Sequence, residues 1–193
     1  MNPLQNASSF LIQTLFDLYL FALLLRFILQ YLRVDYYNPF TQFILKATNP
    51  VVVPLRRFIP GLWGIDFATL FAVLVITFIK ITLITLVSIH KLPFPVGLLV
   101  WSVGDISLLT IKLFFYAILA NVILSWVAPS AYSPVTIIIQ RLVEPLMRPA
   151  RRFIPQIGGF DISPIPVMIV LQLLIMLFAD PVTKTGMLLA TRA

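Results

Sequence analysis

The sequence predicts an all-α membrane protein with four transmembrane helices, arranged as two parallel repeats of two. Each repeat is expected to carry an amphipathic interfacial helix on the cytoplasmic side. Of the 193 residues, 60% are hydrophobic and 11% are charged, and the mean hydropathy is +1.01, whereas soluble domains are about 25% charged. Four apolar runs approach or exceed the roughly 20 residues that a spanning helix needs. A segment of the first half also returns in the second half.

The returning segment is rich in proline and arginine. Residues 54–66 read PLRRFIPGLWGID and residues 149–161 read PARRFIPQIGGFD, so the copies are offset by 95 residues, the difference between positions 149 and 54. Chance would not place RRFIP, a glycine and an aspartate at matching positions. We therefore divide the chain into a first repeat, residues 1–95, and a second repeat, residues 96–193.

Each repeat contains two of the apolar runs. The first run is too long for a signal peptide, and no Lys or Arg precedes Arg26, so it is expected to remain as a helix. Because each repeat has an even number of spans, both enter the bilayer in the same direction, related by an axis along the membrane normal. We expect a quasi-symmetric four-helix bundle. Its spans are placed at about residues 8–32, 65–89, 101–128 and 162–179.

A shorter helix is expected between the two spans of each repeat, because apolar residues recur there at helical spacing. Pro39 and Pro134 suit the first helical turn, and Pro50 and Pro145 are expected to end the helices. About ten residues are too few to span a bilayer, so these helices are expected to lie in the cytoplasmic interface. The apolar positions are Phe40, Phe43, Ile44 and Ala47 in the first repeat and Val135, Ile138, Ile139 and Leu142 in the second.

Orientation follows from the basic residues in the connections. They concentrate between spans one and two and between spans three and four, which places both connections in the cytoplasm and both termini outside it. The net charge of +7 suits anionic lipid, which attracts juxtamembrane Lys and Arg. Nucleic acid is not an expected partner, because no soluble basic domain is present to hold it.

The paired arginines of each copy, with the aromatic residue that follows, form the first candidate site. Guanidinium groups bind phosphate bidentately, and aromatic side chains enter the acyl boundary. Two interpretations stay open, namely positive-inside anchoring alone or a specific contact with lipid or a partner. The residues are Arg56, Arg57, Phe58, Arg151, Arg152 and Phe153. Asp66 and Asp161, just before spans two and four, are expected to cap those helices, with pairing to a repeat arginine as the alternative.

Charges inside the spans form the second candidate site. Asp17, Lys80 and Lys112 are expected at similar depth, and Asp17 and Lys112 occupy equivalent positions in the two repeats. An ion pair within the membrane is the simplest account, with Asp105 as another partner for a lysine. A structural pair and an ion-conducting or sensing site both remain open. Arg26, near the cytoplasmic end of span one, is expected to reach the interface.

No catalytic constellation is recognised in the sequence. The chain contains no cysteine and one histidine, His90, which leaves no thiolate ligand and no histidine cluster for a metal. HExxH, GxSxG and glycine-rich phosphate-binding motifs are absent from it. We therefore expect a protein that is not an enzyme and that uses no cofactor.

The duplicated RRFIP segment, followed by glycine and aspartate, resembles the YggT family, also called YlmG. The second copy, EPLMRPARRFIPQIGGFDISP, resembles the family pattern best, and the first copy departs from it at Asn49, where the pattern has glutamate. The resemblance implies a bacterial inner-membrane protein linked to hyperosmotic stress tolerance and ion homeostasis. It also implies links to cell division, and in plastids to nucleoid distribution or cytochrome assembly. It implies no catalytic residues.

Two functions follow as hypotheses. The first is a role in osmotic and cation homeostasis, as part of a channel or as its modulator; because a bundle of four helices fills its own core, conduction would need a homo-oligomer or another membrane protein. The second is a membrane scaffold or assembly factor that holds anionic lipid or a cell-division or assembly partner through the basic cytoplasmic loops.

Overall fold

The computed structural model describes residues 3–61, 64–127, 133–154 and 161–191. Over these residues the fold is all-helical, with no strand. Four helices are long and apolar enough to cross a membrane, so the fold is that of a multi-pass membrane protein. The elements are α1 (Pro3–Tyr31), α2 (Pro39–Arg56), α3 (Phe67–Ile89), α4 (Pro95–Val127), α5 (Pro134–Phe153), α6 (Pro164–Leu174), η1 (Ile175–Ala179) and α7 (Asp180–Thr191).

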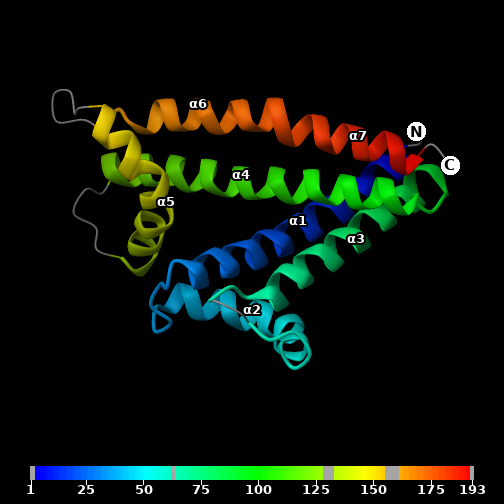
Figure 1. Ribbon diagram of the computed structural model, residues 1–193, viewed down its shortest axis with the longest axis horizontal. Coiled ribbons are helices and arrows are strands. Elements are labelled where there is room, and N and C mark those ends of the chain that lie inside the picture. The colour runs from blue at the N-terminus through cyan, green and yellow to red at the C-terminus, as the bar shows by residue number, and fades with distance from the viewer. Residues whose placement is uncertain (1–2, 62–63, 128–132, 155–160, 192–193) are drawn as a thin grey trace.

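The long helices pack as two pairs that meet at α4. Helix α1 packs on α3, and α4 packs on α6 and α7, while α4 also contacts α1 and α3. Figure 1 shows α6 and α7 along one side of α4, with α1 and α3 crossing on the other side. Helix α4 is therefore the central element, and the pairs do not form the evenly closed bundle that strict repeat symmetry would give.

The connections between the long helices lie at two opposite ends of the molecule. Both termini and the α3–α4 connection lie at one end of the molecule, and α2 and α5 lie at the other end (Figure 1). Helices α2 and α5 also touch each other, and Asn38 Nδ2 donates a hydrogen bond to the Pro134 carbonyl oxygen at 2.8 Å. The segments with the RRFIP copies thus share one end of the fold, although residues 155–160, which complete the second copy, lie outside the described residues.

The extents of α2 and α5 correct the expectation that Pro50 and Pro145 end these helices. Each helix continues past its first proline and includes a second one four residues later, Pro54 or Pro149. All four prolines lie on the exposed side of their helix, apart from the buried face that packs on the spans. Packing of that face offsets the lost backbone hydrogen bonds, which elsewhere cost about 3 kcal/mol per proline.

The expected apolar face of these helices is correct in part. Ile44, Ile138 and Leu142 are buried, whereas Phe43 and Val135 are exposed. Thr48 and Val52 replace the expected positions and extend the buried face of α2 toward its C-terminus. In α5, Val143 and Met147 do the same.

The fourth spanning helix extends beyond the predicted end at residue 179. It runs through α6, η1 and α7 to Thr191. The residues of η1 form a π-helical turn directly before Asp180 and Pro181. In a π turn each backbone N–H bonds to the carbonyl five residues earlier, and the turn here comes directly before a proline that has no N–H to donate. The helix therefore continues past residue 179, where the end of the apolar run had predicted that it would end.

Candidate functional site

A buried ion-pair cluster joins three of the long helices. Lys80 of α3 is 1% exposed. Its Nζ donates to Asp17 Oδ1 of α1 at 2.6 Å and to Asp105 Oδ2 of α4. We call these three residues the Lys80 triad. Two of its members come from the first repeat and one from the second, so the triad also links the repeats.

The triad lies well inside the spanning segments. At 1.5 Å per residue, about 13 Å of helix separates Lys80 from the end of α3, and about 15 Å separates Asp105 from the start of α4. Those two helix ends adjoin the same short connection. Lys80 and Asp105 are therefore at matching depths on neighbouring helices, which is why they meet.

The triad carries two carboxylates and one ammonium group. With all three ionised its net charge is −1, in a setting where a charged side chain is costly and is held by partners. Lys80 is the cation in direct contact with both carboxylates, so its loss would leave each of them without its ion-pair partner. A proton or a small cation bound there would cancel the remaining charge.

Lys112 is not part of the triad, and the ion pair expected within the membrane forms between Asp17 and Lys80. Lys112 is partly exposed and makes no direct hydrogen bond or ion pair with the described residues, although its charge is near enough to interact with the Asp105 carboxylate of the triad. Asp17 of α1 faces α3, the helix that carries Lys80. Asp105, which sequence reasoning treated only as an alternative partner, is the third member.

Arg26 is buried, which corrects the expectation that it reaches the interface. Its Nη1 donates to Thr48 Oγ1 at 2.8 Å and to Asn49 Oδ1 at 2.9 Å, both on α2. Its Nε is also buried and has no hydrogen-bond partner among the described residues. The two bonds fix α2 against α1, and so position the segment that carries the first pair of arginines.

The first arginine of each pair binds the aspartate of its own repeat. Arg56 Nη2 lies 2.6 Å from Asp66 Oδ2, and Arg151 Nε lies 2.9 Å from Asp161 Oδ2. Arg56 also donates to Gln30 Oε1 at 2.8 Å. The ion pair that was the alternative for these aspartates is therefore present in both repeats, at equivalent positions.

The capping role holds for one of the two aspartates. Asp66 is the N-cap of α3 and accepts from the Thr69 backbone N–H at 3.3 Å. Asp161 lies two residues before the N-cap of α6, Ser163, and accepts from the Ser163 backbone N–H at 3.0 Å. Because α6 begins at Pro164, the second carboxylate closes the turn that leads into the helix and does not cap it.

Both carboxylates have a lowered pKa. Burial acts to raise the pKa of Asp66, but the hydrogen bonds from Arg56 and Thr69 outweigh it and hold the pKa below the usual 3.8. Burial likewise acts to raise the pKa of Asp161, and the bonds from Ser163 and Arg151 outweigh it. Both groups are therefore charged at neutral pH, as the ion pairs require.

The second arginine of each pair and the following phenylalanine face outward. Phe58 is 83% exposed and Phe153 is 85% exposed. Arg57 and Arg152 are exposed too, and they make no hydrogen bond or ion pair with the described residues. Of the six predicted contact residues, Arg56 and Arg151 are thus engaged inside the protein. The other four form two outward Arg–Phe pairs.

The described residues contain no group of three or more side chains suited to hold a metal ion. Charged side chains of the described residues gather at the Lys80 triad and at the outward Arg–Phe pairs.

Comparison with known families gives two matches to one family. The family described as CCB3/YggT matches residues 5–87 and 100–182. The two matched segments begin at positions 5 and 100, the same offset that separates the RRFIP copies.

Relatives match over almost the whole chain. An uncharacterised protein of Pseudomonas aeruginosa is 44% identical over 97% of this chain and 96% of its own length. The uncharacterised protein YggT of Escherichia coli K12 is 39% identical over 95% of both chains. An uncharacterised protein of Vibrio alginolyticus, from the region 3′ of proC, is 43% identical over 91% of this chain and 95% of its own length. No solved structure shows significant similarity to the chain.

Proposed function

The chain belongs to the CCB3/YggT family, and from that premise we propose that it is a non-enzymatic protein of the inner membrane that contributes to ion homeostasis under hyperosmotic stress. In this proposal both termini lie outside the cytoplasm. Helices α2 and α5 lie at the cytoplasmic face of the membrane. The concentration of basic residues beside α2 and α5 supports that orientation through the positive-inside rule.

The Lys80 triad is the observation that carries the proposal. Ionisable side chains within spanning helices usually mark ion or proton routes, or sites that sense them. The triad is buried, joins α1, α3 and α4, and has one carboxylate more than it has ammonium groups. A proton or a monovalent cation that exchanges at the triad would alter the attraction that holds these three helices together.

Conduction would require more than one chain or a partner protein, because side chains fill the small core of a single bundle. The outer face of α6 and η1 offers surface for such assembly or for lipid, since Ile165, Ile169 and Leu177 there are all exposed. The proposal therefore covers a subunit of an ion-conducting assembly and a modulator of one.

Growth at high osmolarity tests the proposal. The chain is expressed in a bacterium that lacks its own family member, as wild type and as a variant with Asp17→Asn, Lys80→Met and Asp105→Asn together. We expect the wild type to restore growth and the neutral variant to fail at equal membrane abundance. Lys46→Met is the control and should restore growth, because Lys46 is an exposed cation of α2 outside the triad. Full growth with the neutral variant would contradict the proposal.

A second candidate function is a scaffold or assembly factor that holds anionic lipid or a protein partner at the cytoplasmic face. The outward Arg–Phe pairs favour it, because both repeats present an unpaired arginine beside an exposed aromatic ring. Such pairs suit phosphate groups at a membrane surface.

Photocrosslinking in cells tests this second candidate. A photoreactive phenylalanine analogue replaces Phe58 or Phe153, and in a control it replaces Tyr37, which is 86% exposed at the same end of the fold. We expect distinct lipid or protein adducts at Phe58 and Phe153 that Arg57→Glu and Arg152→Glu abolish. If Tyr37 gave adducts of the same yield and pattern, crosslinking at Phe58 and Phe153 would reflect only their exposure to the surroundings, and the specific contact would be contradicted.

A further inference from the structure

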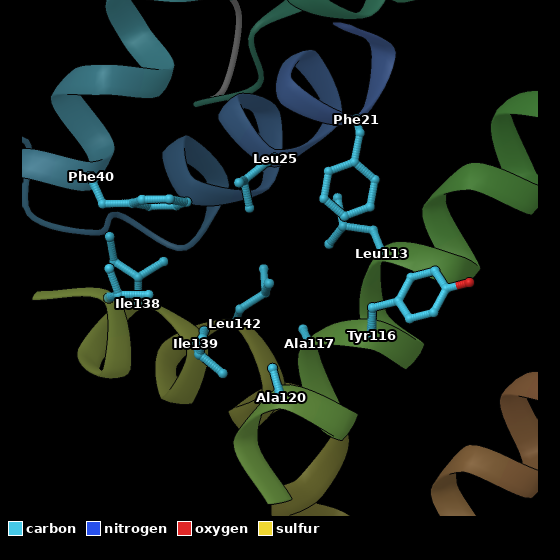
Figure 2. A pocket seen from close by; sticks show the side chains of 11 residues that line it. Phe21, Leu25, Phe40, Leu113, Tyr116, Ala117, Ala120, Ile138, Ile139 and Leu142 are labelled. Carbon is cyan, nitrogen blue, oxygen red and sulfur yellow. The ribbon is translucent and has the colours of Figure 1, made fainter. Parts of the chain in front are cut away.

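An apolar groove lies at the seam between the two repeats. It has a volume of about 190 Å³ and is lined by side chains of α1, α2, α4 and α5. Figure 2 shows Phe21 and Leu25 above it, Phe40, Ile138 and Ile139 on one side, and Ala117 and Ala120 below. Neither the Lys80 triad nor the Arg–Phe pairs contribute to its walls.

The hollow arises from unequal side chains at equivalent positions. Three pairs related by the repeat line it, namely Phe21 with Tyr116, Leu25 with Ala120, and Phe40 with Val135. In two of these pairs the second repeat supplies the smaller side chain. A leucine at position 120 would match the first repeat and fill space that Ala120 leaves open.

The walls suit hydrocarbon and offer nothing to a polar ligand. Among the side chains of the groove the only polar atom is the Tyr116 hydroxyl, and in Figure 2 it points away from the hollow. A dry apolar cavity of about 150 Å³ already binds benzene, so this groove has room for part of an acyl chain. Helices α1 and α4 are candidate membrane spans, which places the partly open groove beside lipid.

An exposed cation, Arg141, is a neighbour in the sequence of residues that line the groove. Arg141 follows Ile138 by one helical turn on α5 and precedes Leu142, and both of these residues line the groove. The Arg141 side chain is exposed and makes no hydrogen bond or ion pair with the described residues. Guanidinium is well suited to a phosphate group.

The depth of the groove also suits a lipid. On α4, Leu113 to Ala120 lie about 10–21 Å along the helix from Val127, a depth that suits acyl chains below a headgroup layer.

We propose that this groove binds one acyl chain of an anionic glycerophospholipid whose phosphate lies against Arg141. The bound acyl chain then packs between the two repeats and contacts α1, α2, α4 and α5. The site is independent of the proposed role in ion homeostasis and does not require the Lys80 triad.

The test uses the full chain, purified in detergent, and phosphatidylglycerol that carries a photoreactive diazirine within one acyl chain. We expect crosslinks at groove-lining residues, and competition by unlabelled phosphatidylglycerol in the wild-type protein. Ala120→Leu should lower the crosslinking yield about tenfold, the factor that corresponds to 1.4 kcal/mol. Ala47→Leu is the matched control, because it adds the same atoms at an exposed position of α2, and it should leave the yield unchanged.

A second arm tests the headgroup. Arg141→Gln should weaken the competition by phosphatidylglycerol and leave that by zwitterionic phosphatidylethanolamine unchanged. Equal loss for both lipids, or no loss, would overturn the assignment of the phosphate to Arg141. Equal crosslinking of Ala120→Leu and wild type, or crosslinks that fall mainly on the outer face of α6 and α7, would overturn the groove as the acyl site.

Discussion

Lys80 is a fully buried cation, and its replacement is expected to have the largest effect of any substitution in the triad. Its ammonium group neutralises charge on two helices at once, whereas each aspartate contributes to one contact. Removing one partner of a buried ion pair costs about 3–5 kcal/mol, because an unpaired charge stays behind. Replacing the whole cluster with neutral side chains is less costly for the same reason.

Lys80→Met is therefore expected to lower the thermal unfolding temperature in detergent, by the equivalent of about 3–5 kcal/mol. Adding Asp17→Asn and Asp105→Asn to it should recover part of the loss. Lys112→Met, at a cation without an ion pair, should change the unfolding temperature little. If Lys80→Met and Lys112→Met behave alike, the triad does not hold the helices together.

The aspartates before α3 and α6 give a prediction for low pH. The pKa of Asp66 is lowered in the folded protein, so its stabilising effect is complete above the unfolded pKa of 3.8 and is lost as the pH falls through the lowered folded pKa. The difference in unfolding free energy between wild type and Asp66→Asn should thus be constant near neutral pH and vanish in acid. Chemical unfolding at a series of pH values measures it.

The same comparison at Asp161 should give a smaller difference. The Asp161 side chain is 27% exposed, against 3% for Asp66, and solvent weakens exposed ion pairs. A larger loss for Asp161→Asn than for Asp66→Asn would contradict the assignment of Asp66 as the more strongly held carboxylate.

At the scale of elements, the contact between α4 and α7 depends on small residues. Gly186 lies against the backbone of Trp101, and Gly104 lies against the backbone of Thr183. A Cβ at either glycine would overlap the facing backbone, so the helices would have to separate. Close helix packing through small residues is a main source of association within membranes.

Gly186→Ala is expected to destabilise the α4–α7 contact by about 1–3 kcal/mol, the usual cost of overpacking. Limited proteolysis and thermal unfolding should both show the loss. Leu188→Ala, two residues away at an exposed position, is the control and should have little effect. Wild-type stability in Gly186→Ala would mean that the two helices are not in close contact.

The same scale shows where sequence patterns fail. The four spans were predictable because length and apolar content decide them without reference to neighbours. The ends of α2 and α5 were not, because their passage through Pro50 and Pro145 depends on buried side chains such as Val52 and Met147. Proline alone signals an end, and packing against the spans overrides that signal.

The candidate sites divide in the same way. The outward Arg–Phe pairs and the aspartate pairing were within reach of the sequence, since the repeat marks the residues. The partner of Asp17 was not, because two lysines lay at similar predicted depth. Only the packing of α1 and α4 around α3 selects Lys80 and adds Asp105.

At the scale of the whole molecule, the proposed topology places the RRFIP segments in the cytoplasm and the α3–α4 connection outside it. Because the chain contains no cysteine, single cysteines introduced at chosen positions can test this topology by labelling. In intact cells, single cysteines at Phe58 and at Phe153 should be shielded from a membrane-impermeant maleimide. A cysteine at Leu92, which is exposed between α3 and α4, should react. Labelling at Phe58 but not at Phe153 would contradict the parallel arrangement of the repeats.

Ion flux into proteoliposomes that contain only this protein tests most directly whether the Lys80 triad acts on ions. For a conducting assembly built from this chain alone, the account predicts a cation or proton flux above that of empty vesicles. This flux should be lost in the variant with Asp17→Asn, Lys80→Met and Asp105→Asn and retained in Lys46→Met. Flux of equal size in the neutral variant would contradict a role for the triad. Vesicles that stay as tight as empty ones would contradict conduction by this protein alone.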